Sequence, residues 1–134
     1  MQQLKRVIFV CVHNSGRSQM AEAFAQKLGK SKIIAESAGT QPGASLNPQV
    51  VEAMREIGYD MSGHYPKMLT WEMAESADKV ITMGCGVDAE SCPAAIVPME
   101  DWGLDDPKGQ PLEKVREIRD QVKARVERLL LELK

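Results

Sequence analysis

The chain has 134 residues, of which 43% are hydrophobic and 27% are charged, and its formal net charge is −2. This length suits one domain, residues 1–134, and a chain of this size buries a stable core without disulfides. The negative charge disfavours nucleic acid as a partner, because phosphate backbones are bound by basic surfaces. No apolar run approaches the roughly 18 residues that a membrane span requires. We expect a monomer that binds neither nucleic acid nor membranes.

The three cysteines, Cys11, Cys85 and Cys92, bear on the cellular compartment. The N-terminal residues lack the small-residue cleavage site of a signal peptide. An odd number of cysteines without an export signal is typical of reduced thiols in the cytoplasm. We therefore expect a cytoplasmic protein without a disulfide framework, although one or two of these cysteines could simply be buried core thiols.

Strands alternate with helices along the whole chain. Short apolar runs rich in β-branched residues predict strands, and these lie at 7–10, 32–35, 79–83 and 94–97. Apolar residues at helical spacing predict helices, and these lie at 20–28, 47–57, 70–77 and 112–133. A loop is expected at 37–39. This order implies an α/β fold of three layers, in which helices flank a four-stranded parallel sheet.

Ligands in such folds bind beyond the carboxyl ends of the strands. Cys11, Cys85 and the segment after Val97 each follow a predicted strand. We therefore expect all three to lie at one edge of the sheet.

The loop between the first strand and the first helix carries a cysteine and an arginine separated by five residues. A short loop that enters a helix N-terminus turns its backbone N–H groups inward and binds anions. Arg17 can hold two oxygens of a tetrahedral oxyanion, and Gly16 permits a backbone conformation that a side chain would resist. The predicted oxyanion-binding residues are Val12, His13, Asn14, Ser15, Gly16, Arg17 and Ser18.

Cys11 lies at the centre of this positive field. The amides that attract an oxyanion also stabilise a thiolate, so the pKa of Cys11 is expected to fall. Ser18 can donate a hydrogen bond to the sulfur, and Asn14 can fix the loop from within. The alternative is a buried cysteine at a strand end with Arg17 on the surface.

The Cys-x5-Arg-Ser pattern in this position resembles the low-molecular-weight tyrosine phosphatases and the arsenate reductases built on their fold. The run from Asn14 to Glu22, Asn-Ser-Gly-Arg-Ser-Gln-Met-Ala-Glu, is closer to the reductases. The resemblance extends nearly end to end, through 36–39, Asn47-Pro48, the Cys85 segment and 105–107. It implies the low-molecular-weight phosphatase-like fold, which agrees with the predicted sheet.

An acidic loop at 101–107 follows the last predicted strand. Displacing an oxygen from an oxyanion requires a proton for the leaving group, and the resemblance assigns this proton to Asp106, the Asp before Pro, with Asp105 as the alternative. The tyrosine phosphatases usually carry aromatic residues directly after this Asp-Pro, whereas here Lys108-Gly109 follows. That difference favours a small inorganic anion over a tyrosine phosphate.

Cys85 and Cys92 are separated by six residues in a segment of Gly, Asp and Ser that we expect to be mobile and exposed. Thiol–disulfide exchange through three cysteines can supply two electrons. The reductases that this chain resembles carry a cysteine pair at this spacing and place, which implies a redox-active Cys85–Cys92 disulfide. Two incidental cysteines are the alternative, and metal binding is disfavoured because no Cys-x2-Cys or histidine accompanies them.

The resemblance implies reduction of arsenate to arsenite by Cys11, Arg17, Asp106, Cys85 and Cys92. Phosphate or sulfate can occupy the same loop. No bound cofactor or metal is expected, because an external thiol reductant, thioredoxin or glutaredoxin, supplies the electrons. The rival function is a low-molecular-weight protein-tyrosine phosphatase that uses Cys11, Arg17 and Asp106 with water. A non-catalytic oxyanion sensor ranks last.

Some relatives bind a potassium ion through Asn, Glu, Ser and Asp side chains. Asn14, Glu22 and Ser37 match the first three, and Lys67 lies near the fourth position. Because a lysine ammonium can replace the charge of the cation, we expect no potassium dependence. We assign no chemical role to His64, and we place His13 at the rim of the loop.

Overall fold

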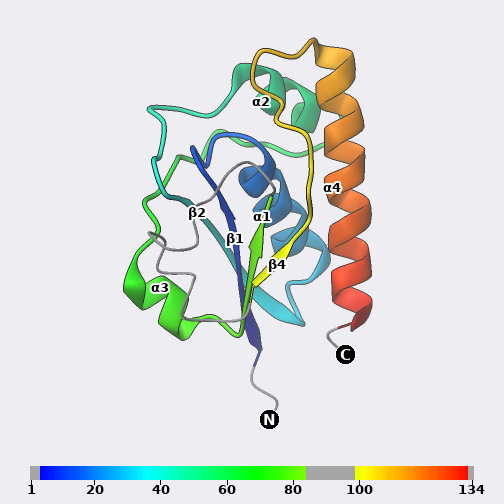
Figure 1. The fold of residues 1–134 in the computed structure, drawn as a ribbon. Coiled ribbons are helices and arrows are strands. Elements are labelled where there is room, and N and C mark those ends of the chain that lie inside the picture. The colour runs from blue at the N-terminus through cyan, green and yellow to red at the C-terminus, as the bar shows by residue number, and fades with distance from the viewer. Residues whose placement is uncertain (1–3, 84–98, 133–134) are drawn as a thin grey trace.

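The computed structural model describes residues 4–83 and 99–132 (Figure 1). The predicted strand at 94–97 and the cysteines Cys85 and Cys92 lie outside these residues. The α/β architecture is confirmed, with strands and helices alternating over most of the chain. The elements are β1 (Lys5–Cys11), α1 (Arg17–Leu28), β2 (Ile33–Gly39), α2 (Pro48–Arg55), α3 (Trp71–Ser76), β3 (Lys79–Thr82), β4 (Met99–Asp101) and α4 (Leu112–Glu132).

The four described strands form one parallel sheet in the order β2-β1-β3-β4. In the centre, Val10 of β1 pairs with Ala38 of β2 and with Thr82 of β3. Since all the strands run in the same direction, their carboxyl ends meet at one edge. This is the edge where Figure 1 shows β1 leading into α1.

Side chains of β1 alternate between the two faces of the sheet. Val7 and Phe9 belong to a large core cluster with residues of α1, α2 and α4. Ile8 and Val10 belong to a smaller cluster, against which Met73 of α3 packs. The side chains at positions 7–10 have no exposed surface. Burial on both faces of the sheet explains why this part of β1 is a continuous apolar run.

The extent of β2 differs from the sequence-based expectation. β2 continues through residues 37–39, where we expected a loop. The reason is that β1 extends to Cys11, and Cys11 pairs with Gly39 of β2. The final described strand, β4, spans Met99–Asp101, and the expected strand at 94–97 lies outside the described residues. The predicted start of α3 is confirmed, since the hydroxyl of Thr70 accepts a hydrogen bond from the backbone N–H of Met73 at 3.1 Å.

An ion cluster fixes α2, whose N-terminus lies near the carboxyl edge of the sheet, against α4. Arg116 donates to Glu56 at 2.6 Å, and Arg119 donates to the carbonyl of Ala53 at 2.9 Å. The hydrogen bond from Arg116 holds the pKa of Glu56 below its usual value.

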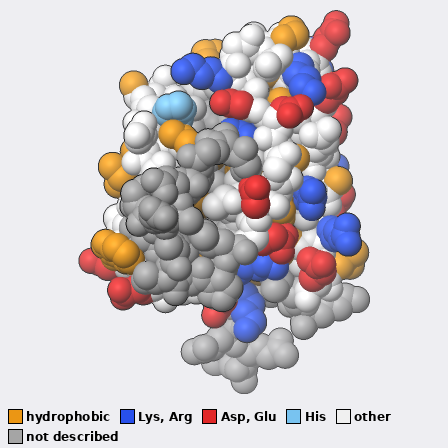
Figure 2. All heavy atoms as spheres, viewed as in Figure 1, with side chains coloured by type: hydrophobic (Ala, Val, Ile, Leu, Met, Phe, Trp, Pro, Cys, Tyr) orange, Lys and Arg blue, Asp and Glu red, His pale blue; other side chains and the backbone are white. Residues whose placement is uncertain are grey.

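Acidic and basic side chains are interspersed on the face that Figure 2 shows, including the side formed by α4. A broad field of one charge is not visible among the described residues there. No helix in the described parts of the chain combines the length and the apolar character needed to cross a membrane.

Replacing Ile118 by Ala should lower the free energy of unfolding by about 2 to 5 kcal/mol. Ile118 is fully buried where α4 packs in the main core, so the substitution leaves a cavity. Chemical denaturation measures the loss. Leu131→Ala, on the same helix but with Leu131 63% exposed, is the control and should change stability by no more than about 0.5 kcal/mol. Equal losses in the two variants would contradict the observed orientation of α4.

Candidate active site

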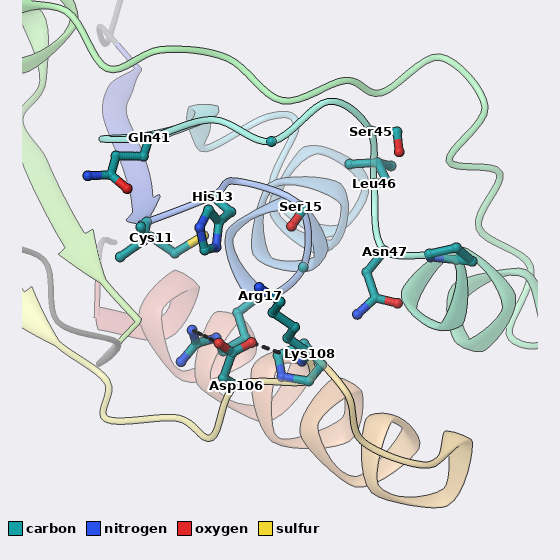
Figure 3. A pocket seen from close by; sticks show the side chains of 15 residues that line it. Cys11, His13, Ser15, Arg17, Gln41, Ser45, Leu46, Asn47, Asp106 and Lys108 are labelled. Carbon is teal, nitrogen blue, oxygen red and sulfur yellow. Dashed lines mark hydrogen bonds and ion pairs between the residues drawn. The ribbon is translucent and has the colours of Figure 1, made fainter.

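An open pocket of about 680 Å³ lies at the carboxyl edge of the sheet (Figure 3). Its walls come from three segments that are far apart in the sequence. The lining residues are Cys11, Val12, His13, Ser15, Gly16 and Arg17; Gln41, Gly43, Ser45, Leu46, Asn47 and Pro48; and Asp106, Pro107 and Lys108.

The carbonyl groups of the loop from Cys11 to Gly16 all accept hydrogen bonds from neighbouring groups. Four of the donors are backbone N–H groups of the segment 40–47, one is a side-chain amide, and one is an N–H of α1. The pairs are Thr40 N to Cys11 O at 3.3 Å, Gln41 N to Val12 O at 2.8 Å, Gly43 N to His13 O at 2.9 Å, Gln19 Nε2 to Asn14 O at 3.1 Å, Asn47 N to Ser15 O at 2.9 Å and Met20 N to Gly16 O at 3.0 Å.

This bonding fixes the direction of the loop amides. In a planar trans peptide the N–H points opposite to the carbonyl, so the N–H groups of residues 12–17 turn away from the groups that hold the carbonyls. One of them, the N–H of Asn14, donates to the Cys11 Sγ at 3.2 Å. The loop is therefore a cradle of N–H donors around the sulfur, which suits an anion.

The Cys11 sulfur lies in a hydrogen-bond network and is almost buried, with 4% of the residue exposed. Its Sγ is 2.8 Å from the hydroxyl of Ser18. That hydroxyl accepts from Asn14 Nδ2 at 2.7 Å, which leaves its own hydrogen for the sulfur. Donors from Ser18 and Asn14 stabilise the thiolate form of Cys11.

Asn14 has an unusual backbone conformation that its side-chain hydrogen bonds stabilise. Its φ is 51°, in the left-handed region that Asn adopts more readily than most residues. Gln19 Nε2 donates to its side-chain oxygen at 3.0 Å, and the backbone N–H of Lys67 donates to the same oxygen at 2.8 Å. Gln19 was not among the predicted site residues, because nothing in the residue pattern distinguishes it from a helix-surface amide.

Arg17 is held rigidly from one side. Its side chain is 3% exposed, and its Nη1 donates to the carbonyls of Met83 at 3.0 Å and of Leu104 at 2.5 Å. Nη2 lies 3.9 Å from Asp106 Oδ2, and Nε is a buried donor without an acceptor among the described residues. The Nε–Nη2 edge can therefore hold two oxygens of an oxyanion.

Asp106 reaches the pocket from the loop before α4, as Figure 3 shows. Its Oδ1 accepts from the backbone N–H of Lys108 at 2.9 Å, so Oδ2 is the oxygen that faces Arg17. The approach of this loop also explains Gly16, since a Cβ there would lie 2.9 Å from Pro107 Cγ. Asp105, the alternative acid, pairs instead with Lys114 at 2.9 Å.

A buried carboxylate lies behind the loop. The side chain of Glu22 is 7% exposed. Its Oε1 accepts from the Ser37 hydroxyl at 2.6 Å and from Lys67 Nζ at 3.2 Å. Its Oε2 lies 3.5 Å from His64 Nδ1, which is also 3.1 Å from Gln19 Oε1. Lys67 thus brings a positive charge to the carboxylate, as the sequence analysis anticipated.

The structure brings most of the predicted site residues together. Cys11, Arg17 and Asp106 share the pocket, and the exposed His13 lies at its rim. Asn14 and Ser18 lie behind the pocket and contact the sulfur. Cys85 and Cys92 lie outside the described residues. Within the described residues, no group of three or more His, Cys, Asp or Glu side chains is arranged to hold a metal ion.

The segment 41–48 is the part of the site that the sequence analysis did not find. It forms one wall of the pocket, and its N–H groups orient the loop carbonyls. Its donors are backbone N–H groups, which side-chain patterns in the sequence do not reveal. The only feature predicted within this segment was the helix start at Asn47-Pro48.

A model of the low molecular weight phosphotyrosine protein phosphatase family matches residues 6–134. The chain belongs to this family. The resemblance drawn from the Cys-x5-Arg-Ser pattern is thereby confirmed.

Relatives within this family include arsenate reductases. The glutaredoxin arsenate reductase of Synechocystis sp. is 42% identical over 131 residues, which cover 97% of this chain and 99% of the relative. A solved arsenate reductase in the phosphate binding state has a TM-score of 0.87 and 41% identity, covering 98% of this chain and 100% of that one. The thioredoxin-dependent arsenate reductase of Corynebacterium glutamicum has a TM-score of 0.81 and 34% identity, covering 98% of this chain and 63% of that one.

Replacing Ser18 by Ala should make Cys11 a poorer thiolate. The variant loses a hydrogen bond to a charged sulfur, so the midpoint of the pH profile for alkylation should rise by about one to two pH units. Iodoacetamide alkylation in a Cys85→Ala, Cys92→Ala background isolates Cys11. The control Ser62→Ala, made in the same background, should leave the midpoint in place. An unshifted midpoint in Ser18→Ala would show that the hydroxyl does not stabilise the thiolate.

Replacing Lys67 by Ala should lower the free energy of unfolding by about 1 to 3 kcal/mol, because Glu22 would remain buried without its ammonium partner. The control is Lys32→Ala, because Lys32 is exposed.

The unaltered protein should melt at the same temperature in KCl and in NaCl of equal ionic strength, because the Lys67 ammonium already occupies the place of a cation beside Glu22. Stabilisation by potassium specifically would contradict the replacement of the cation by Lys67.

Proposed function

We propose that this protein reduces arsenate to arsenite and so serves arsenic detoxification in the cytoplasm. The observation that carries the proposal is the cradle of inward N–H groups around Cys11, completed by the Nε–Nη2 edge of Arg17 and by Asp106. A tetrahedral oxyanion suits this cradle, and the similarity to arsenate reductases across nearly the whole chain supports arsenate as the substrate.

In the first step the Cys11 thiolate attacks arsenic. A sulfur–arsenic bond forms and an arsenic–oxygen bond breaks. Asp106 protonates the departing oxygen, which leaves as water. Arg17 holds the remaining oxygens. The geometry of Asp106 supports this role, because its Oδ2 faces Arg17 while its Oδ1 accepts from the backbone N–H of Lys108.

In the second step Cys85 attacks the sulfur of Cys11. A Cys11–Cys85 disulfide forms, the sulfur–arsenic bond breaks, and its electron pair stays on arsenic, which leaves as arsenite. Cys92 then attacks Cys85 and releases the Cys11 thiolate. Two thiols have been oxidised to a Cys85–Cys92 disulfide and one arsenic atom has gained two electrons. The roles of Cys85 and Cys92 rest on their place in the sequence.

An external dithiol protein of the thioredoxin or glutaredoxin type resets the Cys85–Cys92 disulfide. Relatives named for each of these reductants are similar to this chain. The cytoplasm keeps such reductants reduced. The chain itself needs no bound cofactor, since the electrons come from thiols, and one copy of the chain supplies every residue of the relay.

The phosphatase reaction is the second candidate, because it needs the same Cys11, Arg17 and Asp106. Two observations favour the reductase. The described lining of the pocket contains no Phe, Tyr or Trp that could grip a tyrosine ring. In addition, a phosphatase that uses water has no role for Cys85 and Cys92.

A thiol titration tests the proposed function directly. Reduced protein, freed of reductant and given arsenate, should fall from three free thiols to one, with one arsenite formed and Cys85 joined to Cys92 by mass spectrometry. The Cys92→Ser variant should form one arsenite and stop with Cys11 joined to Cys85. Three surviving thiols in folded protein that binds phosphate would refute the reductase function. Full multiple turnover by Cys92→Ser would refute the relay.

A further inference from the structure

Lys108 is a charged residue of the pocket to which the reaction above gives no side-chain role. It lies two residues after Asp106 and lines the same pocket. Figure 3 shows its side chain extending from the Asp106 loop across the pocket towards the loop that begins at Cys11. No carboxylate of the described residues lies within 4.0 Å of its ammonium, whereas Lys67, Lys79 and Lys114 each have such a partner.

The negative charges of the oxyanion and the Cys11 thiolate together exceed the single positive charge of Arg17. Arsenate, like phosphate, carries between one and two negative charges near neutral pH, and it must approach a Cys11 thiolate that carries another. Arg17 offsets one of these charges. Among the described lining residues Lys108 is the remaining permanent cation.

We propose that the Lys108 ammonium is a second cationic ligand of the oxyanion, which it draws into the cradle and holds there against the repulsion of the thiolate. This inference rests on the proposed site at Cys11 and Arg17. An ammonium at the pocket mouth favours a doubly charged oxyanion over a singly charged one.

The side chain of Lys108 can be changed without disturbing the acid. Asp106 is held through the backbone N–H of Lys108, and any residue except proline retains this donor. The side chain is exposed, so its substitution leaves no cavity. A loss of oxyanion affinity in a Lys108 variant therefore reports on the ammonium.

The test measures the Kd of inorganic phosphate by calorimetry at low ionic strength, which does not depend on the redox relay. Lys108→Met should raise the Kd by about 3- to 10-fold, Lys108→Glu should raise it by more than about 10-fold, and Lys108→Arg should stay within about 3-fold of the unaltered protein. The difference between Lys108→Met and the unaltered protein should shrink as salt is added. For arsenate the loss should fall on KM more than on kcat.

Lys30→Glu is the matched control, because Lys30 is exposed and follows the C-terminus of α1, at the end of that helix away from the pocket. It makes the same change in net charge and should leave the Kd within about twofold. If Lys108→Glu and Lys30→Glu bind phosphate equally, the proposal is wrong. Phosphate binding that depends on Lys108 in a protein that forms no arsenite would uphold this inference while refuting the proposed function.

Discussion

The outward orientation of six consecutive carbonyl groups, from Cys11 to Gly16, is the constraint on which the rest of the site depends. A backbone loop has as many acceptors as donors, and it attracts an anion only when the acceptors are engaged elsewhere. Here the segment 40–47 engages four of them, Gln19 engages one and α1 engages one. The N–H groups are thereby committed to the pocket before any ligand arrives. Such preorganisation is what makes electrostatic stabilisation effective in a site.

The same constraint links the loop to charges that never reach the pocket. Asn14 holds its left-handed conformation because Gln19 and the backbone of Lys67 bond its side chain. Gln19 and Lys67 are in turn joined to the buried Glu22, directly or through His64. A buried carboxylate is tolerated only when it is paired and hydrogen-bonded. The positive charge of Lys67 therefore stabilises the buried Glu22 and, with it, the hydrogen bonds that hold Asn14 in place.

The sequence was sufficient to predict features encoded in side chains. The apolar run of β1 and the Cys-x5-Arg spacing each specify a local structure, and the Asp-Pro step gave Asp106 through the family resemblance. Backbone pairing was not predictable in the same way. The extension of β2 through Gly39 depends on backbone pairing with the neighbouring strand β1, which the sequence of β2 does not reveal. The donors of the segment 40–47 become visible only when the fold places them against the loop.

The cradle alone does not choose between hydrolysis and reduction. A thiolate and an oxyanion are both anions, so one set of donors stabilises the nucleophile and then the group it attacks. Attack of sulfur on the central atom is common to both reactions. If water attacks the central atom next, its oxidation state is unchanged. If a second thiol attacks the Cys11 sulfur instead, the electron pair of the sulfur–arsenic bond passes to arsenic. The outcome is thus decided by which nucleophile reaches which atom: water at the central atom, or a second thiol at the Cys11 sulfur.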